Sequence, residues 1–198
     1  MALTDKQHQD KIMSKNFSNI LVVDLEATCS SDNSILPESM EIIEIGAVWV
    51  SAQGEFLGQF QRYVRPITNP VLTTFCAELT GIEQYEIDRA FTWLEVAVDF
   101  GRFIAQFNGS RNYWGSWGTY DKKQIERECN RHQVENPLLD MHHENLKSSF
   151  AKNRKIKQVG MATALKIVGL SIEGEHHRAM SDACNIARLL PACHRFNK

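Results

Sequence analysis

The distribution of apolar positions along the chain first indicates a series of strands. Residues 19–25 are apolar on both sides of the chain and rich in β-branched side chains, as in a central strand that is covered on both faces. A second apolar run occupies residues 41–50, and turn residues at 52–55 lead into a third strand at residues 56–64. We expect these three strands to form an antiparallel meander.

Apolar side chains recur at helical spacing in the rest of the chain. Four segments share this periodicity: residues 91–107, 121–132, 161–168 and a last helix that runs to about residue 193. Residues 108–110, with the sequence Asn-Gly-Ser, end the first of these helices, and a short strand at residues 113–117 precedes the second. Ser181 or Asp182 is the expected cap of the last helix. Strands followed by helices in this way predict an α/β fold.

The length and composition fit one globular domain. The chain has 198 residues, of which 43% are hydrophobic and 23% charged, which is the balance of a folded protein. Residues 1–16 are polar and mixed in charge, so we expect a loosely ordered N-terminal extension there and a single domain over residues 17–198. No apolar run approaches the roughly 20 residues that span a bilayer, which predicts no membrane segment.

The cysteines and the N-terminus bear on the location of the protein. The five cysteines include no Cys-x-x-Cys pair, and the N-terminus has no apolar signal-peptide core. Reduced thiols in a cytoplasmic protein are the simplest interpretation of these features. They leave the oligomeric state open.

The charge pattern gives no overall basic signature of a nucleic-acid-binding protein. The formal net charge is −2, so any nucleic-acid binding would depend on a local basic patch or on metal ions at an acidic site. One basic cluster stands out: Lys147, Lys152, Arg154, Lys155 and Lys157. Our hypothesis is that it contacts phosphates of a bound strand, and the alternative is a solvated basic loop.

Two carboxylates at the end of the first strand are the first candidate for chemistry. Asp24 and Glu26 are two residues apart, and side chains alternate across a strand, so both point to the same face. Two like charges held together need a cation or a proton between them, and Mg²⁺ and Mn²⁺ prefer oxygen ligands. The alternative is an exposed, solvated Asp and Glu at the start of a loop.

Three further polar residues lie at the starts of later helices. Asp121 opens the helix that follows the short strand, where a favourable interaction with the helix dipole is the alternative role. Asp182 shares a helix face with Ile186 and Leu189, so its carboxylate is directed inward. His177 lies in the loop that precedes this last helix. Each residue alone is a weak signal, because helix starts often carry an Asp and surfaces often carry a His.

The order of these residues along the chain is more specific than any one of them. An Asp-x-Glu ends a buried strand, an Asp follows a later strand, and a His-x4-Asp opens the last helix. This order resembles the three exonuclease motifs of the DEDDh, or DnaQ-like, 3′–5′ exonucleases. The resemblance covers about residues 18–192. It implies an RNase-H-like α/β fold with a central mixed five-stranded sheet flanked by helices.

The resemblance also implies a catalytic mechanism with two divalent metal ions, Mg²⁺ or Mn²⁺. Asp24 would bridge both ions, while Glu26 and Asp182 would bind the ion that holds the attacking water. Asp121 would support the second ion directly or through water. His177 would be the general base, because an unperturbed imidazole titrates at about pH 6.5.

Longer segments resemble the Eri-type and KapD-like exoribonuclease subgroup of this family. These segments are residues 24–29 (DLEATC), 41–47 (EIIEIGA), 75–82 (FCAELTGI) and 177–179 (HRA). They imply a 3′–5′ exonuclease that releases nucleoside 5′-monophosphates from nucleic-acid 3′ ends, with RNA favoured over DNA as the partner. This is the function that we expect.

The same resemblance implies a cradle for the terminal nucleotide. Its members would be Ala27, Thr28, Leu79, Thr80 and Ile82. A backbone amide near Thr28 would bond the 3′-hydroxyl, and Leu79 or Ile82 would wedge against the last base. The alternative is that Leu79 and Ile82 are core residues.

Two other functions remain open at this point. A DNA 3′–5′ exonuclease of the proofreading or repair type shares the same motifs. A catalytically silent nucleic-acid-binding module would have lost a carboxylate or the histidine, and this chain has lost none. His176 is a second candidate for the base, although the spacing to Asp182 favours His177. His142 and His143 have no assigned role.

Overall fold

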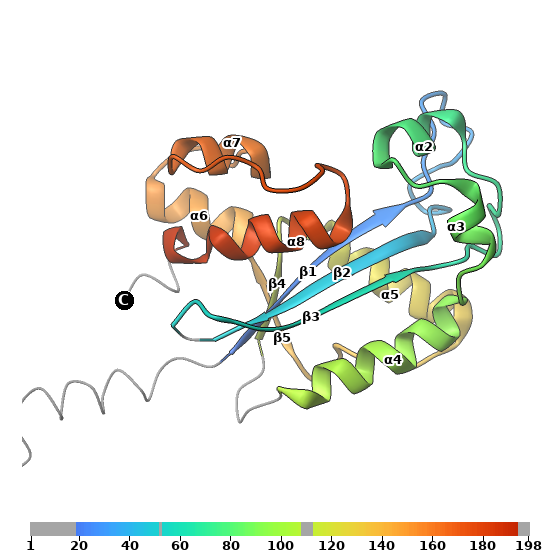
Figure 1. The fold of residues 1–198 in the computed structure, drawn as a ribbon, viewed down its shortest axis with the longest axis horizontal. Coiled ribbons are helices and arrows are strands. Elements are labelled where there is room, and N and C mark those ends of the chain that lie inside the picture. Colours follow the sequence, from blue (N-terminus) through green and yellow to red (C-terminus); the bar gives the residue numbers. More distant parts are fainter. Residues whose placement is uncertain (1–18, 52, 108–112, 194–198) are drawn as a thin grey trace, which may run out of the picture.

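A mixed five-stranded sheet forms the centre of the molecule (Figure 1). The computed structural model describes residues 19–51, 53–107 and 113–193. The strands are β1 (Ile20–Ala27), β2 (Ile42–Val50), β3 (Phe56–Tyr63), β4 (Tyr113–Ser116) and β5 (His142–Asn145), in the spatial order β3-β2-β1-β4-β5. β1, β2 and β3 are antiparallel neighbours, whereas β4 and β5 run parallel to β1. The expected meander and mixed five-stranded sheet are confirmed.

Helices cover both faces of the sheet. They are α2 (Thr74–Thr80), α3 (Gln84–Asp88), α4 (Trp93–Gln106), α5 (Tyr120–His132), α6 (Leu146–Arg154), α7 (Met161–Ile167), α8 (Ala179–Arg188) and the 3₁₀ turn η1 (Leu190–Ala192). Figure 1 shows α4 and α5 on one face and α8, with α6 and α7, on the other. None of the helices among the described residues has the length and apolar character to cross a bilayer.

Each face of β1 belongs to a different apolar core. Leu21, Val23 and Leu25 pack in the cluster that includes α4 and α5. Ile20 and Val22 pack in the cluster that includes α6, α7 and α8. Because side chains alternate along a strand, a strand between two helical layers must be apolar at nearly every position. This explains why the first four residues of β1, Ile20 to Val23, are all apolar.

Four elements were not anticipated from periodicity. The helices α2, α3 and α6 are short or only weakly amphipathic, and β5 has the polar sequence His-His-Glu-Asn. β5 forms because it completes the sheet beside β4, and not because its residues favour strands. Three residues of the basic cluster, Lys147, Lys152 and Arg154, lie within α6 rather than in a loop.

The last helix begins earlier than expected. α8 starts at Ala179 with Arg178 as its N-cap residue, and the Asp182 amide donates to the Arg178 carbonyl oxygen at 2.9 Å. Ser181 and Asp182 are therefore residues of the first turn rather than caps, which corrects the expected boundary. Fraying and side-chain capping make such boundaries uncertain by a few residues. The expected extension at residues 1–16 and the helix end at 108–110 lie outside the described residues.

Candidate active site

Asp24 and Glu26 lie near the carboxyl end of β1, on the face that α8 covers. They continue the alternation of Ile20 and Val22, whose side chains are buried in the core on that face. Asp24 pairs across the sheet with Gly46, against which the start of α8 packs. One face of β1 thus changes from apolar to acidic at the point where α8 begins.

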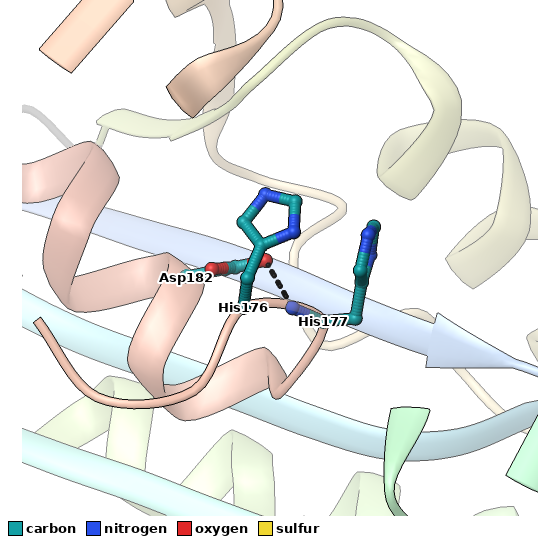
Figure 2. Close-up of side chains that lie close together, drawn as sticks. All are labelled: His176, His177 and Asp182. Atoms are coloured by element: carbon teal, nitrogen blue, oxygen red, sulfur yellow. Dashed lines mark hydrogen bonds between the residues drawn. The ribbon is translucent and has the colours of Figure 1, made fainter. Parts of the chain in front are cut away.

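Asp182 contributes a buried carboxylate from the first turn of α8. Its Oδ2 accepts a hydrogen bond from the His177 amide at 3.1 Å (Figure 2). Its Oδ1 is buried and has no hydrogen-bond partner among the described residues. A buried carboxylate oxygen without a donor is unfavourable unless a proton or a cation compensates its charge. Asp182 therefore has one oxygen directed into the site and available to a cation.

Asp121 reaches the same region from the first turn of α5. Its side chain is buried, close to the Ser116 hydroxyl and to the backbone at Leu25. β4 runs parallel to β1, so the loop after β4 leaves the sheet at the edge where β1 ends. This topology brings Asp121 to Asp24 although 97 positions separate them in the chain.

Burial raises the pKa of all four carboxyl groups, and neighbouring carboxylate charges add to the shifts of Asp24 and Glu26. Burial raises the pKa of Asp24 well above its usual range, and the charges of Asp121, Glu26 and Asp182 raise it further. Burial, followed by the charges of Asp182 and Glu44, raises the pKa of Glu26 to about 8. Burial also raises the pKa of Asp121 to about 6, although hydrogen bonds to its carboxylate oppose this shift. Such a cluster is stabilised by protons or by cations.

The donor set fits a divalent metal ion. Ligand oxygens of Asp24, Glu26 and Asp182 lie within 4.8 Å of one another. Carboxylate oxygens are the ligands that Mg²⁺ and Mn²⁺ prefer, and the unpartnered Asp182 Oδ1 belongs to this set. Asp121 is outside this group of three, and its charge acts on Asp24 from the side of α5. Sequence reasoning had named all four carboxylates as metal ligands.

His177 lies in the loop before α8, with a left-handed backbone φ of 64°. Few non-glycine residues adopt this conformation, which is frequent at functional sites. Burial and the neighbouring His176 charge lower the pKa of His177, so its imidazole is neutral at pH 7 and can accept a proton. The two imidazoles lie side by side with ring centroids 3.9 Å apart, and His176 is the more exposed residue (Figure 2).

The start of α8 is anchored by Glu44, to which the sequence analysis assigned no role. Glu44 is fully buried in β2 and accepts hydrogen bonds from the Arg178 Nε at 3.2 Å and from the Ala179 amide at 3.1 Å. Arg178 also donates to the Tyr63 hydroxyl on β3. These contacts fix both residues that follow His177. The available signal was a Glu in the middle of an otherwise apolar strand.

The residues expected to cradle a nucleotide differ in exposure. Leu79 is 38% exposed at the end of α2, whereas Ile82 is completely buried in a small core with Cys76. Ile82 was expected either to wedge against the last base or to be a core residue, and its burial is that of a core residue. Thr80 is also buried, and its hydroxyl donates to the Cys76 carbonyl oxygen at 2.9 Å.

The strand end that includes Ala27 and Thr28 is bound to its surroundings. The Thr28 amide donates to the Glu41 carbonyl oxygen at 2.8 Å, and the Thr28 hydroxyl accepts from the Glu41 amide at 2.9 Å. The Thr28 amide itself is therefore already paired within the protein, and the bond from an amide near Thr28 to a 3′-hydroxyl stays a prediction. The Cys76 thiol lies 3.6 Å from the Ala27 carbonyl oxygen and connects this strand end to α2.

The basic cluster begins near the loop that connects β4 to α5, the helix in which Asp121 lies. Ser116 of β4 pairs with Asn145 of β5, so α6 starts beside the loop that precedes α5. The Trp117 indole in that loop donates to the Val159 carbonyl oxygen at 3.0 Å, in the turn after α6. Lys147 follows at the start of α6, on the same edge of the sheet.

Comparisons with known proteins agree with this geometry. The exonuclease family model RNase_T matches residues 21–190. The chain is similar to ERI1 exoribonuclease 2 of Homo sapiens, with 28% identity over 87% of this chain and 28% of that protein. It is also similar to the 3′-5′ exonuclease Snipper of Drosophila melanogaster, with 28% identity over 88% of this chain and 68% of that protein. The chain thus spans less than a third of the ERI1 exoribonuclease 2 relative.

A solved structure has the same arrangement of elements. It is the nuclease domain of 3′hExo, described as a DEDDh family member bound to rAMP. The identity is 27%, the TM-score is 0.80, and the match covers 87% of this chain and 90% of that domain. The likeness confirms the RNase-H-like fold that the motif order implied.

Proposed function

Because the chain belongs to the RNase_T exonuclease family, whose model matches residues 21–190, we propose that it is a metal-dependent 3′–5′ exonuclease. It would release nucleoside 5′-monophosphates from nucleic-acid 3′ ends. One observation carries this proposal: Asp24, Glu26, Asp121 and Asp182 converge from three elements on one site beside His177. Such a site matches the needs of phosphodiester hydrolysis better than those of a silent binding module, which has no use for a repulsive buried cluster.

In this proposal the four carboxylates bind the metal ions. Asp24, Glu26 and Asp182 would hold a first Mg²⁺ or Mn²⁺ ion, and Asp121, together with Asp24, would support a second. Bound there, the ions supply charge neutralisation at the scissile phosphate and lower the pKa of the attacking water. The protein's own contribution is to fix these oxygens in place before substrate binds, and Glu44 does so for the start of α8 by accepting from the Ala179 amide.

His177 would accept the proton of the attacking water. Its lowered pKa keeps the imidazole neutral at pH 7, the form that can act as a base. The hydrogen bond from its amide to Asp182 fixes the backbone from which the imidazole projects. His177 and Asp182 are therefore connected directly at the start of α8.

We propose RNA as the substrate class. Several relatives are named exoribonucleases, and a matched structure is titled as recognition of a histone mRNA stem-loop by a 3′-exonuclease. Leu79, exposed at the end of α2, would pack against the terminal base. Ala27, Thr28, Thr80 and Ile82 would support the same pocket, the last three mainly from inside. The free thiols in the described part of the chain agree with a cytoplasmic location, which we retain in the proposal.

The basic α6 segment would bind the strand upstream of the cleaved end. Lys147 lies at the same sheet edge as Asp121, and Lys152, Lys155 and Lys157 continue along α6 and the turn after it. Their side chains are partly or fully exposed and can reach phosphates. A local basic path of this kind supplies phosphate contacts that the net charge of −2 does not.

The experiment that tests the function uses RNA and DNA oligonucleotides of one sequence, with 3′ overhangs and labels at the 5′ end. Each is incubated with the protein and Mn²⁺ or Mg²⁺, with EDTA as a control. We expect a metal-dependent ladder that shortens from the 3′ end, faster on RNA. A ladder that is equal or faster on DNA would move the substrate to DNA. Folded protein that gives no ladder with either metal would contradict the proposed activity.

Two neighbouring variants identify the base in the same assay. His177→Ala should lower the rate by about 10²- to 10⁴-fold, the usual effect of losing a general base. His176→Ala is the matched control, since it removes an imidazole at 3.9 Å from the first. It should stay within about threefold of the wild-type rate. The reverse result would assign the base to His176.

A further inference from the structure

Glu41, Glu128 and His132 form a second buried group of ligand atoms, separate from the four carboxylates of the active site. Glu41 is the residue before β2, and the other two lie four residues apart near the end of α5, on one face of the helix. One ligand atom from each residue lies within 4.8 Å of the other two. Glu41 is completely buried, Glu128 is almost so, and the His132 side chain is only 6% exposed.

The His132 imidazole has a buried nitrogen without a hydrogen-bond partner. No acceptor among the described residues is aligned with Nε2, and although Glu128 Oε1 lies 3.3 Å away, the two atoms do not form a hydrogen bond. A buried polar atom in this position is unfavourable unless something else compensates it. Burial lowers the pKa of His132, so its imidazole is neutral at pH 7. With no acceptor for a proton on Nε2, the free lone pair belongs on that nitrogen, beside the Glu128 carboxylate.

The Glu41 carboxylate is held by the loop that follows β3. The backbone amides of residues 67–69 donate to its two oxygens at distances of 2.6–3.0 Å. Amides can only donate, so this arrangement suits an ionised carboxylate. Carboxylates that bind metal ions are commonly oriented by hydrogen bonds of this kind.

The Glu128 carboxylate has different neighbours at its two oxygens. Oε2 accepts from the Ile42 amide at 3.3 Å and from the Arg131 guanidinium at 2.8 Å. Oε1 is the oxygen that lies next to His132 Nε2. Arg131 balances one of the two carboxylate charges in the group, so a negative charge remains. A cation bound between the two carboxylates and the imidazole would balance it.

We propose that Glu41, Glu128 and His132 bind a structural Zn²⁺ ion, in addition to the ions of the active site. Zinc accepts imidazole together with carboxylate ligands, whereas Mg²⁺ prefers oxygen alone. Ligand atoms at about 2.1 Å from a tetrahedral zinc ion lie about 3.4 Å apart, close to the 3.3 Å between His132 Nε2 and Glu128 Oε1. The ion would connect the start of β2 to the end of α5. This inference does not depend on the exonuclease activity.

The test measures the zinc that the full chain retains. Asp182→Asn serves as the background, because Asp182 belongs to both of the other groups that could hold an ion, one with Asp24 and Glu26 and one with His176 and His177. The protein is loaded with Zn²⁺ and desalted, and its zinc is determined by elemental analysis. We expect one zinc ion per chain to remain in this background.

A pair of histidine variants in this background locates the ion. His132→Phe keeps a ring but removes the nitrogen ligand, so the protein should retain at least about 10-fold less zinc. His142→Phe makes the same change on an exposed histidine of β5 that packs on Tyr113, and it should retain as much zinc as the background. Thermal unfolding in EDTA shows whether each variant is folded.

A measurement with Co²⁺ decides the matter even if His132→Phe does not fold. Co²⁺ in place of zinc absorbs strongly in the visible range when its ligands are tetrahedral and weakly when they are octahedral. The Asp182→Asn protein with Co²⁺ should give the strong absorption, and Zn²⁺ should abolish it by displacing Co²⁺. Weak absorption would contradict the proposed site.

The outcomes separate this inference from the proposed function. Asp182→Asn protein that retains no zinc would overturn the structural site, and so would equal zinc in the His132→Phe and His142→Phe variants. Either result leaves the exonuclease proposal as it stands, since the oligonucleotide ladder tests that activity. A missing ladder would in turn leave the zinc site in place.

Discussion

The carboxylates show how single residues in this molecule combine instability with function. Asp24, Glu26 and Asp182 would each be more stable in water than in a buried cluster, and each has a raised pKa. Free energy stored in this way is recovered when a cation binds. When a residue is kept for function at a cost in stability, replacing it should raise the stability and lower the activity of the protein. Both effects can be measured.

Replacing Asp24 should have such opposite effects. Asp24→Asn keeps the shape of the side chain but removes one of the repelling charges, so activity should fall to background. In EDTA, the melting temperature should rise because the repulsion is relieved. Nuclease assays and thermal melts measure the two effects. Asp140→Asn, an exposed residue, is the matched control and should change neither. Full activity of Asp24→Asn would contradict the metal site.

The stability of the metal-free protein should depend on pH in a defined direction. The pKa of Glu26 is raised from 4.5 to about 8, so the folded state holds its proton more tightly than the unfolded state does. The contribution of the protonated Glu26 carboxyl group to the free energy of unfolding is fully present below pH 4.5. It is lost as the pH rises through about 8. Other groups in the molecule also titrate in this range, so the comparison of interest is with Glu26→Gln.

The measurement is a series of thermal melts in EDTA between these pH values. The wild-type melting temperature should fall toward pH 8 more steeply than that of Glu26→Gln. Saturating Mn²⁺ should reduce the difference, because a bound cation replaces the proton. Identical pH profiles of the two proteins in EDTA would show that the pKa of Glu26 is the same in the folded and unfolded states, which contradicts the raised pKa.

At the level of elements, the contact between β2 and α8 determines where His177 and Asp182 lie. A Cβ built on Gly46 would lie 2.2 Å from the Ala179 carbonyl carbon, so only glycine allows this approach of helix to strand. Glu44, two residues earlier on the same face of β2, binds the Ala179 amide. The strand thus provides both the space and the anchor for the first turn of α8.

Adding a methyl group at Gly46 should therefore disrupt the site. Gly46→Ala would push the start of α8 away from β1 and separate Asp182 from Asp24, with a large loss of activity. Overpacking of this kind typically costs about 1–3 kcal/mol of stability. Gly101→Ala in α4 is the control, because the nearest atom to its Cβ is Pro137 Cβ at 3.9 Å. A fully active Gly46→Ala would show that α8 tolerates the shift.

At the scale of the whole molecule, β1, β4 and β5 are parallel, so the functional residues that follow these strands lie at one edge of the sheet. The segments after these strands begin α5 and α6 and carry Asp121 and Lys147. Ligand sites in α/β folds form at the carboxyl ends of strands for this reason. The acidic centre and the basic helix α6 are therefore adjacent, although the net charge is slightly negative.

Binding of a single-stranded RNA should become less salt-dependent when α6 loses charge. Lys147→Gln with Lys152→Gln removes two phosphate contacts, so the slope of log affinity against log salt should flatten by about 1.4. Fluorescence anisotropy in EDTA, which removes the metal ions that the proposed cleavage requires, measures this slope. Arg89→Gln with Arg102→Gln, in α3–α4, is the charge-matched control. An unchanged slope in the lysine variant would remove α6 from the binding surface.

Much of the fold followed from local patterns in the sequence. The meander of β1, β2 and β3 was predictable because a strand between two layers is continuously apolar and its turns carry characteristic residues. The helices α4, α5 and α7 have a clear apolar period. By contrast, β5 has no strand-like composition, and α6 has a weak apolar face, so both depend on neighbours that the sequence does not reveal.

The sequence by itself determined which residues carry the motif and in what order: Asp24, Glu26, Asp121, His177 and Asp182. Only the tertiary structure decided how they are held. Glu44 meets Arg178 across 134 positions, Ser116 meets His143 across 27, and Ile82 is completely buried. The physical reason is that periodicity records short-range geometry, while contacts between distant residues depend on how the layers pack.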